Sequence, residues 1–257
     1  MPFALITGAS KGIGKSIAEL LAARGYDLLL VARSVDLLEQ IATEIHSSAK
    51  KDCRWLALDL AGDQAAESVY EWCDKNQFEV AVLVNNAGYG LSGSFEKYSA
   101  LEYADMLKVN MITLTKLTRL FLPGLLKQPA GYILNIGSTA SYQAVPLLSA
   151  YAASKAYVLS FSRGLYQELR KTNVSVTCVC PGPTDTNFLN RANIGVKGQK
   201  AAERFNMSPQ TVAHIAVESL FRRKPEVITG AVNKLSAFFA WLLPKSVVEG
   251  VAKKLYD

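Results

Sequence analysis

Histidine and cysteine are scarce in this sequence. Its 257 residues include two histidines and four cysteines, and no two cysteines form a C-x-x-C pair. Zinc sites are built from these residues at short, regular spacings, so the sequence predicts no metal site. Few and scattered cysteines are also typical of a reducing compartment, where disulfides are rare.

Long apolar runs are absent as well. No stretch reaches the roughly 18 consecutive apolar residues that a membrane-spanning helix needs. The most apolar segment near the C-terminus is confined to residues 235–243. No basic segment precedes the short apolar run at the N-terminus, as a signal peptide would require. With the cysteine usage, these absences predict a cytoplasmic protein.

The sequence has no general excess of basic charge. The formal net charge is +6, but residues 1–189 hold 17 basic and 17 acidic side chains. The other 11 basic and 5 acidic side chains lie in residues 190–257. A nucleic-acid-binding protein carries a basic patch on its binding face, so no nucleic-acid partner is expected. Part of the excess lies in a basic amphipathic extension at 231–257.

Short apolar runs alternate with amphipathic stretches along the chain. The runs are continuously apolar, as in parallel strands that are buried on both faces. They predict seven strands, at 2–7, 27–32, 53–58, 80–84, 131–136, 174–180 and 226–229. The amphipathic stretches predict helices at 13–24, 35–48, 63–76, 98–122, 151–171 and 208–223. The last of these helices starts with the N-cap pair Ser208-Pro209.

Strand–helix alternation at this spacing predicts an α/β fold. We expect residues 1–257 to form a single Rossmann domain, a doubly wound parallel β-sheet of about seven strands with helices on both faces. Residues 181–207 interrupt the alternation with proline and glycine and little periodicity. A loop of that length in a compact domain is usually functional, so it is interpreted as a substrate lid.

The first predicted strand runs into a glycine-rich loop, TGASKGIG at residues 7–14. Glycines permit a tight turn and close backbone approach, and the helix that follows offers N–H groups and a positive dipole to a phosphate. The loop therefore predicts nucleotide binding, but two interpretations compete. Residues 9–16 approximate the P-loop of nucleotide hydrolases, whereas the three glycines suit a dinucleotide.

Motifs at the ends of the later predicted strands decide between the two. They are Asp59-Leu60, NNAG at 85–88, Asn110, Ser138, YAASK at 151–155 and PGPTDT at 181–186. With the glycine loop, the sequence resembles the short-chain dehydrogenase/reductase family from residue 7 to residue 186. The resemblance implies an enzyme that interconverts a carbonyl and a secondary alcohol with a nicotinamide cofactor.

Tyr151 and Lys155 are four residues apart and therefore lie on one face of a helix. A phenol has an ordinary pKa near 10, and a neighbouring ammonium lowers that pKa, so Tyr151 becomes a candidate general acid and base. Ser138, at the end of a predicted strand, can hydrogen-bond the same substrate oxygen. The resemblance implies that Lys155 also holds the nicotinamide ribose and that Asn110 relays protons through water.

The end of the second predicted strand favours NADP(H) over NAD. An NAD site usually has an acidic residue there, but the strand ends in Ala32-Arg33, and Asp27 lies at its start. Arginine binds a 2′-phosphate through two hydrogen bonds, and Lys11 adds a second cation. The resemblance implies that Asp59 contacts the adenine and Thr184 the nicotinamide carboxamide.

The predicted cofactor-binding residues combine the glycine loop, the cations and the strand-end motifs. They are Gly8, Ser10, Lys11, Gly12, Ile13, Gly14, Arg33, Asp59, Leu60, Asn86, Ala87, Gly88, Asn110, Tyr151, Lys155, Pro181, Gly182, Thr184 and Thr186.

The segments that follow the NNAG motif and Ser138 are rich in apolar and aromatic residues, which favours a hydrophobic ketone or ketoacyl substrate. The predicted substrate-binding residues are Ser138, Tyr142, Tyr151 and Phe188. The resemblance implies a homodimer or homotetramer. For the extension at 231–257, covering the domain or a neighbouring subunit is favoured over resting on an anionic membrane surface.

Three functions stay open from the sequence. The leading hypothesis is an NADP(H)-dependent oxidoreductase with Tyr151 as general acid and base. A P-loop nucleotide hydrolase would leave Ser138, Tyr151 and Lys155 without a role. A non-catalytic NADP(H)-binding sensor would keep the cofactor residues but would not need the catalytic ones.

Overall fold

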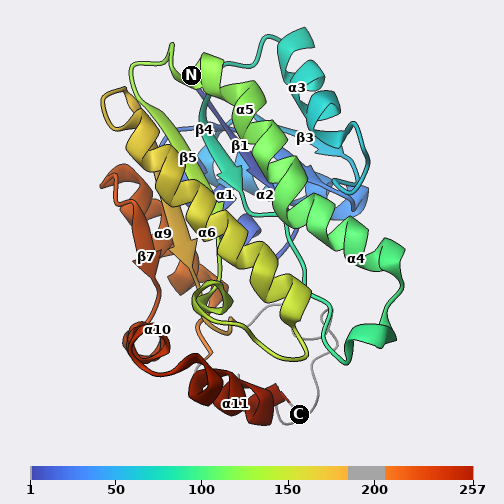
Figure 1. Ribbon diagram of the computed structural model, residues 1–257. Coiled ribbons are helices and arrows are strands. Elements are labelled where there is room, and N and C mark those ends of the chain that lie inside the picture. Colours follow the sequence, from blue (N-terminus) through green and yellow to red (C-terminus); the bar gives the residue numbers. More distant parts are fainter. Residues whose placement is uncertain (1, 185–205, 257) are drawn as a thin grey trace.

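The computed structural model describes residues 2–184 and 206–256, in which strands and helices alternate (Figure 1). The strands are β1 (Phe3–Thr7), β2 (Asp27–Ala32), β3 (Cys53–Ala57), β4 (Val80–Asn85), β5 (Gly131–Ile136), β6 (Val174–Cys180) and β7 (Glu226–Ile228). The main helices are α1 (Gly12–Ala23), α2 (Val35–Ala49), α3 (Ala65–Lys75), α4 (Ala100–Leu107), α5 (Leu114–Leu125), α6 (Ser149–Leu169), α9 (Pro209–Phe221), α10 (Ala231–Leu242) and α11 (Lys245–Tyr256).

All seven strands pair in parallel in one sheet of order β3-β2-β1-β4-β5-β6-β7. Helices α1, α2 and α9 cover one face, and α3, α5 and α6 cover the other (Figure 1). The predicted doubly wound α/β fold is confirmed. Because the strand order changes direction between β1 and β4, the crevice beyond their carboxyl ends is the expected ligand site.

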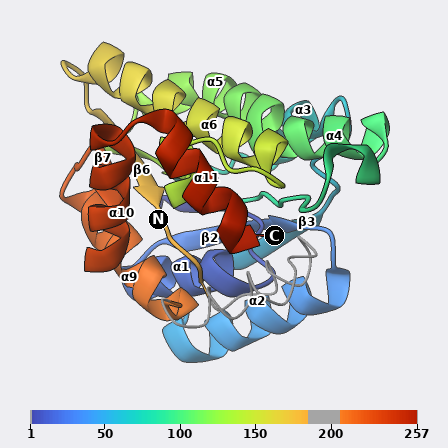
Figure 2. The same ribbon diagram turned by 60° about the horizontal axis from the view of Figure 1, so that its bottom comes forward.

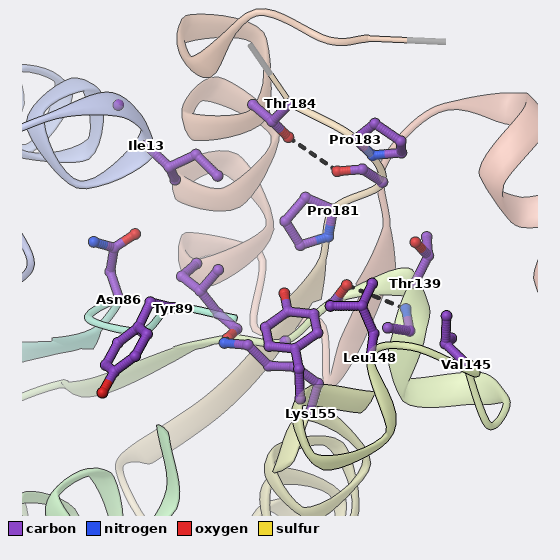
Figure 3. Close-up of a pocket in the computed structure, with 18 of the residues that line it drawn as sticks. Ile13, Asn86, Tyr89, Thr139, Val145, Leu148, Lys155, Pro181, Pro183 and Thr184 are labelled. Atoms are coloured by element: carbon purple, nitrogen blue, oxygen red, sulfur yellow. Dashed lines mark hydrogen bonds between the residues drawn. The ribbon is translucent and has the colours of Figure 1, made fainter. Parts of the chain in front are cut away.

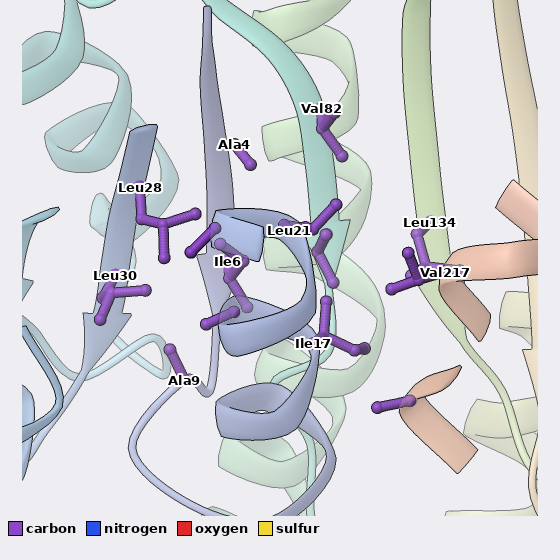
Figure 4. Packing of buried hydrophobic residues seen from close by; sticks show 14 of the residues in the cluster. Ala4, Ile6, Ala9, Ile17, Leu21, Leu28, Leu30, Val82, Leu134 and Val217 are labelled. Atoms are coloured by element: carbon purple, nitrogen blue, oxygen red, sulfur yellow. The ribbon is translucent and has the colours of Figure 1, made fainter. Parts of the chain in front are cut away.

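The core explains why the strands read as continuous apolar runs. Alternate residues of a strand point to opposite faces, and here helices cover both faces. On one face, side chains of β1, β2, β4 and β5 pack against α1 and α9 (Figure 4): Ala4, Ile6, Leu28, Leu30, Val82, Leu134, Ile17, Leu21 and Val217. The intervening residues Leu5, Leu29, Leu83 and Ile133 pack on the opposite face.

The prediction of a single helix at 98–122 is wrong in one respect. Helices α4 and α5 are joined by a π-helical turn, Lys108–Thr113, which contains the predicted site residue Asn110. A π turn holds more residues than an α turn, and such turns are frequent at functional sites. A pattern search at 3.6 residues per turn does not detect this insertion.

The predicted extension at 231–257 forms helices α10 and α11. Both lie along the carboxyl edge of the sheet, and α11 crosses in front of the strands in the second view (Figures 1 and 2). The C-terminal segment is therefore positioned next to the crevice. Most of the lid predicted at 181–207 lies outside the described residues, and its ends meet in a bridge between Thr184 and Met207.

A buried chain of polar side chains ties the middle of the sheet to the helices beside it. Asn85 Nδ2 donates to Thr118 Oγ1 at 3.1 Å and to Asn135 Oδ1 at 2.9 Å. Asn135 Nδ2 in turn donates to Ser162 Oγ at 2.9 Å. Because all four side chains are buried, each of these bonds replaces a lost contact with water.

We expect Asn135→Ala to lower the free energy of unfolding by about 2–3 kcal/mol, because its buried partners lose their bonds. Urea unfolding followed by circular dichroism measures the loss. The control is Ser175→Ala in β6, since Ser175 Oγ is buried without a hydrogen-bond partner among the described residues. That control should be neutral or stabilising, and equal losses in both variants would contradict the role of the network.

Candidate active site

A cavity of about 990 Å³ opens at the carboxyl edge of the sheet. Its wall is built from the segments that follow β1 to β6 and from α10 and α11. This volume is at the upper end of the range of ligand pockets. The cavity therefore lies where the topology predicts the ligand site.

The cavity brings together most of the predicted site residues. Its lining includes Gly8, Ser10, Lys11, Gly12, Ile13, Arg33, Asp59, Leu60, Asn86, Ala87, Gly88, Ser138, Tyr142, Tyr151, Lys155, Pro181, Gly182 and Thr184. Gly14 and Asn110 do not line the cavity, but Gly14 packs against Gly8 and Asn86, and Asn110 lies next to Gly88. Thr186 and Phe188 lie outside the described residues. Figure 3 shows Ile13, Asn86, Lys155 and Pro181 around the same space.

Asn86 holds the glycine loop against the end of β4. Its Nδ2 donates to the carbonyl oxygens of Thr7 and Gly8, at 2.9 and 3.1 Å. Thr7 Oγ1 accepts from the N–H groups of Asn86 and Ala87, at 3.0 and 3.1 Å. Thr7 is a supporting residue that the sequence reasoning missed. The sequence feature that could have identified it is a threonine at the end of an apolar strand, directly before the first glycine of the loop.

The loop fits a dinucleotide phosphate. A Cβ at Gly14 would lie 2.3 Å from the carbonyl oxygen of Gly8 and 2.5 Å from Asn86 Nδ2, so only glycine allows α1 to start this close. The first residues of α1, Gly12 and Ile13, line the cavity. The N-cap residue, Lys11, makes no side-chain bond to the first N–H groups of the helix. Those donors and the helix dipole favour an anion.

The end of β2 presents cations to the cavity. Ala32 is followed by Arg33, whose Nη1 lies 3.8 Å from Asp59 Oδ2, and both side chains are more than half exposed. Such a pair is weak, so the guanidinium can turn toward a phosphate. Asp27 lies at the opposite end of β2, where its Oδ1 accepts from the N–H of Asp52 at 3.0 Å. The strand ends in Ala32, at the place where an NAD site usually has its acidic residue, and the preference for NADP(H) stays a prediction.

Lys155 is buried beside Tyr151. Its Nζ donates to the carbonyl oxygen of Ile136 at 2.8 Å and lies 5.9 Å from the centre of the Tyr151 ring. Burial lowers the pKa of Lys155 to about 8, because the charged form loses its hydration. A Cβ at Gly88 would lie 3.3 Å from this Nζ and 3.0 Å from Asn110 Oδ1. The glycine of the NNAG motif therefore leaves space for the amine.

Ser138 follows β5 and caps the short 3-10 turn Thr139–Tyr142. Its Oγ accepts from the N–H of Ala140 at 3.1 Å. A hydroxyl can accept and donate at once, so its proton can serve a ligand. Ser141 Oγ donates to the carbonyl oxygen of Lys155 at 2.8 Å and fixes this turn to α6. Hydrogen bonds thus connect Ser138, the turn that follows it and the backbone of Lys155.

Asn110 positions its neighbours. Its Oδ1 accepts from the N–H of Tyr89 at 3.1 Å, and its Nδ2 donates to the carbonyl oxygen of Tyr89 and to Ser154 Oγ, both at 3.0 Å. The side chain is buried, and these three bonds connect the π-helical turn to the segment after β4 and to α6. The proton-relay role of Asn110 stays a prediction.

Tyr142 contributes its ring to the cavity wall. Its hydroxyl donates to Glu226 at the start of β7, and Arg163 Nε donates to the same carboxylate at 2.5 Å. Burial raises the pKa of Tyr142 well above its usual value. The hydroxyl therefore remains protonated and engaged with Glu226.

Helices α10 and α11 supply a part of the wall that the sequence reasoning did not assign. Phe239, Leu243 and Val248 are among their lining residues. Asn233 Nδ2 donates to the carbonyl oxygen of Thr229 at 2.8 Å. A Cβ at Gly182 would lie 2.2 Å from this amide nitrogen. The amphipathic pattern of residues 231–257 indicates that this segment packs on another surface, but the pattern does not show that the surface includes the cavity.

The fold and the site define a dinucleotide-binding protein of the doubly wound class. The family described as short chain dehydrogenase matches residues 2–196. The chain belongs to this oxidoreductase family, and the P-loop interpretation is therefore wrong.

Similar proteins agree with this classification. The human very-long-chain 3-oxoacyl-CoA reductase is 37% identical over 188 residues, which cover 70% of this chain and 58% of that protein. The match thus spans little more than half the length of that relative. The ketoacyl reductase HetN of a Nostoc strain is 29% identical over 95% of this chain and 85% of its own. A short-chain dehydrogenase from Sphingobium yanoikuyae, solved with NADPH, is 30% identical with a TM-score of 0.83 over 94% of both chains.

We expect Lys155→Met to stabilise the protein at pH 7, because it removes a buried ammonium. The pKa of Lys155 falls from 10.5 to about 8 on folding, so between these pH values the unfolded chain binds more protons. Below pH 8 the buried ammonium lowers the free energy of unfolding by its full amount. As the pH rises to 10.5 this destabilisation disappears, and the free energy of unfolding increases by about 3 kcal/mol.

Urea unfolding at pH 7 and pH 10 measures this difference. Lys155→Met should lack the gain in stability that the amine gives the unmodified chain at high pH. Lys171→Met, at an exposed lysine after α6, is the matched control and should keep that gain. The same pH dependence in Lys155→Met and the unmodified chain would contradict the burial of the charge.

Proposed function

We propose that the chain is an NADP(H)-dependent oxidoreductase that interconverts a hydrophobic ketone and its secondary alcohol, with 3-oxoacyl thioesters as the first substrate class to test. The observation that carries this proposal is that Ser138, Tyr151 and Lys155 line the same cavity as Gly12 and Ile13. A carbonyl next to the first three residues would share that cavity with a dinucleotide on the glycine loop.

NADP(H) would supply a hydride to the carbonyl carbon. The first N–H groups of α1, at Gly12 and Ile13, would hold its pyrophosphate. Arg33, which follows β2, and Lys11, which precedes α1, line the cavity and would bind the 2′-phosphate. The NADPH complex of the Sphingobium protein supports this choice of cofactor.

The chain's own groups would control the substrate oxygen. The Ser138 hydroxyl would donate a hydrogen bond to it and orient the carbonyl. The Tyr151 hydroxyl would give that oxygen a proton, which leaves a phenolate. Lys155 carries its charge below its pKa of about 8, and the ammonium stabilises the phenolate next to it. In the direction of oxidation, Tyr151 would take the proton back.

The cavity wall supports a hydrophobic substrate. Val145 and Leu148, before α6, pack in one apolar cluster with Tyr151. Phe239, Leu243 and Val248, from the C-terminal segment, add apolar side chains to the wall of the same cavity. Two of the similar proteins are named for 3-oxoacyl and ketoacyl reduction. An acyl chain is the kind of ligand that such a wall would accommodate.

We expect Tyr151→Phe to lower kcat at least about 100-fold, because a general acid typically contributes that much, while NADPH binding is kept. The assay is NADPH absorbance with a panel of 3-oxoacyl thioesters, steroid ketones and small ketones. Tyr157→Phe on the exposed part of the same helix is the matched control. Turnover retained in Tyr151→Phe would refute the mechanism, and NADPH binding without turnover of any substrate would favour a sensor.

We expect Arg33→Ala to raise the Kd for NADPH about 10- to 100-fold, because charge-assisted hydrogen bonds contribute roughly 1.5–3 kcal/mol. The Kd for NADH should change little, since NADH lacks the 2′-phosphate. Fluorescence titration of both cofactors makes the comparison. Arg54→Ala, at an exposed arginine on the neighbouring strand β3, is the control. An equal loss of affinity for both cofactors would overturn the NADP(H) assignment.

A further inference from the structure

Helix α10 has three distinct faces. Asn233, Ala237 and Ala240 recur at helical spacing and form the buried stripe that packs on the protein. The neighbouring residues Val232, Ser236 and Phe239, with Leu243 just after the helix, line the cavity together with the buried stripe. Since small residues face inward, the large apolar residues of the third face are left outside. This is the reverse of an ordinary surface helix, whose polar residues face solvent.

The third face is an exposed aromatic and aliphatic surface, defined here as the outer tail face. It consists of Leu235, Phe238, Trp241 and Leu242 on α10, which are all more than half exposed and do not line the cavity. Trp241 is 75% exposed, and its ring lies 6.1 Å from that of Phe238. Apolar side chains gathered in this way mark a surface that contacts another apolar phase. Figure 2 shows α10 at one border of the molecule and α11 crossing in front of the strands.

The two C-terminal helices also carry several basic side chains. Lys234, Lys253 and Lys254 are exposed, and Lys245 lies at the start of α11. The one acidic residue among the described residues of both helices is Glu249. Lysines next to exposed tryptophan and leucine are the composition of a helix that lies in a membrane interface, where long lysine side chains reach the headgroups.

A second copy of this chain fits the face less well. A symmetric dimer would place the same patch against itself, so the lysines of one copy would meet those of the other. A single glutamate does not compensate four lysines. Anionic headgroups do compensate them, and acyl chains cover the apolar side chains.

We propose that the outer tail face docks on the surface of an anionic lipid bilayer. Because α10 and α11 also line the cavity, docking places the cavity wall next to the lipid, and an apolar substrate can move between the two. No helix in residues 2–184 and 206–256 has the length and apolarity to cross a bilayer.

Vesicle co-sedimentation of the full chain tests the proposal. Vesicles of phosphatidylglycerol and phosphatidylcholine should bind the protein, and vesicles of phosphatidylcholine alone should bind it much less. The double variant Phe238→Ser/Trp241→Ser and the charge reversal Lys253→Glu/Lys254→Glu should each lower partitioning at least about tenfold. Trp241 emission, taken as the difference between the unmodified chain and Trp241→Phe, should shift to shorter wavelength on the anionic vesicles.

The matched controls are Leu101→Ser, at an exposed leucine on α4, and Lys127→Glu, at an exposed lysine after α5. Both should partition like the unmodified chain, and circular dichroism checks that every variant is folded. Absence of binding to anionic vesicles would overturn the proposal, as would equal losses in variants and controls. A lower molar mass of Phe238→Ser/Trp241→Ser in light scattering would also overturn it, because the face would then belong to a second copy.

Discussion

The buried amine of Lys155 constrains the whole candidate active site, because a cation that has left water needs a hydrogen-bond acceptor and a closely fitted environment. Its Nζ bonds to Ile136 at the end of β5, and its own carbonyl oxygen accepts from Ser141. Gly88, after β4, leaves room for it. Three chain segments are thus in contact with one lysine residue. This amine destabilises the fold below pH 8 and supplies the charge that the proposed proton transfer uses, so stability is given up where the chemistry is carried out.

Much of the fold could be predicted from the sequence, because a parallel sheet covered on both faces produces continuous apolar runs. The strand β5, for example, is Gly131–Ile136 in both the prediction and the structure. The exception is the π-helical turn in the helix predicted at 98–122. The stability of that turn comes from contacts across the chain, such as the bonds of Asn110 to Tyr89 and Ser154. Contacts of this kind leave no periodic pattern in the sequence.

The residues of the candidate site also fall into those that a sequence pattern reveals and those that only tertiary contacts reveal. Cavity-lining residues that belong to a short motif, such as those of the glycine loop and the Tyr151–Lys155 pair, could be predicted from spacing. Residues that act by holding other segments could not. Thr7 binds backbone N–H groups that are far away in sequence, and Asn233 packs against Gly182 from a different helix. Their residue types are unremarkable in the sequence, and only the tertiary contacts give them a role.

The C-terminal helices line the cavity on one side and carry an exposed apolar face on another. A helix of this length has room for a packing stripe, a cavity stripe and an outer stripe, since each stripe needs a residue only every three or four positions. In α10 the packing stripe is made of small residues, so the larger ones are available to the cavity and to the outside. The excess of positive charge in the last quarter of the sequence then acquires a local meaning. Four of its lysines lie on the two helices that carry the apolar face beside the cavity, and the proposed hydrophobic substrate would enter from lipid at that place.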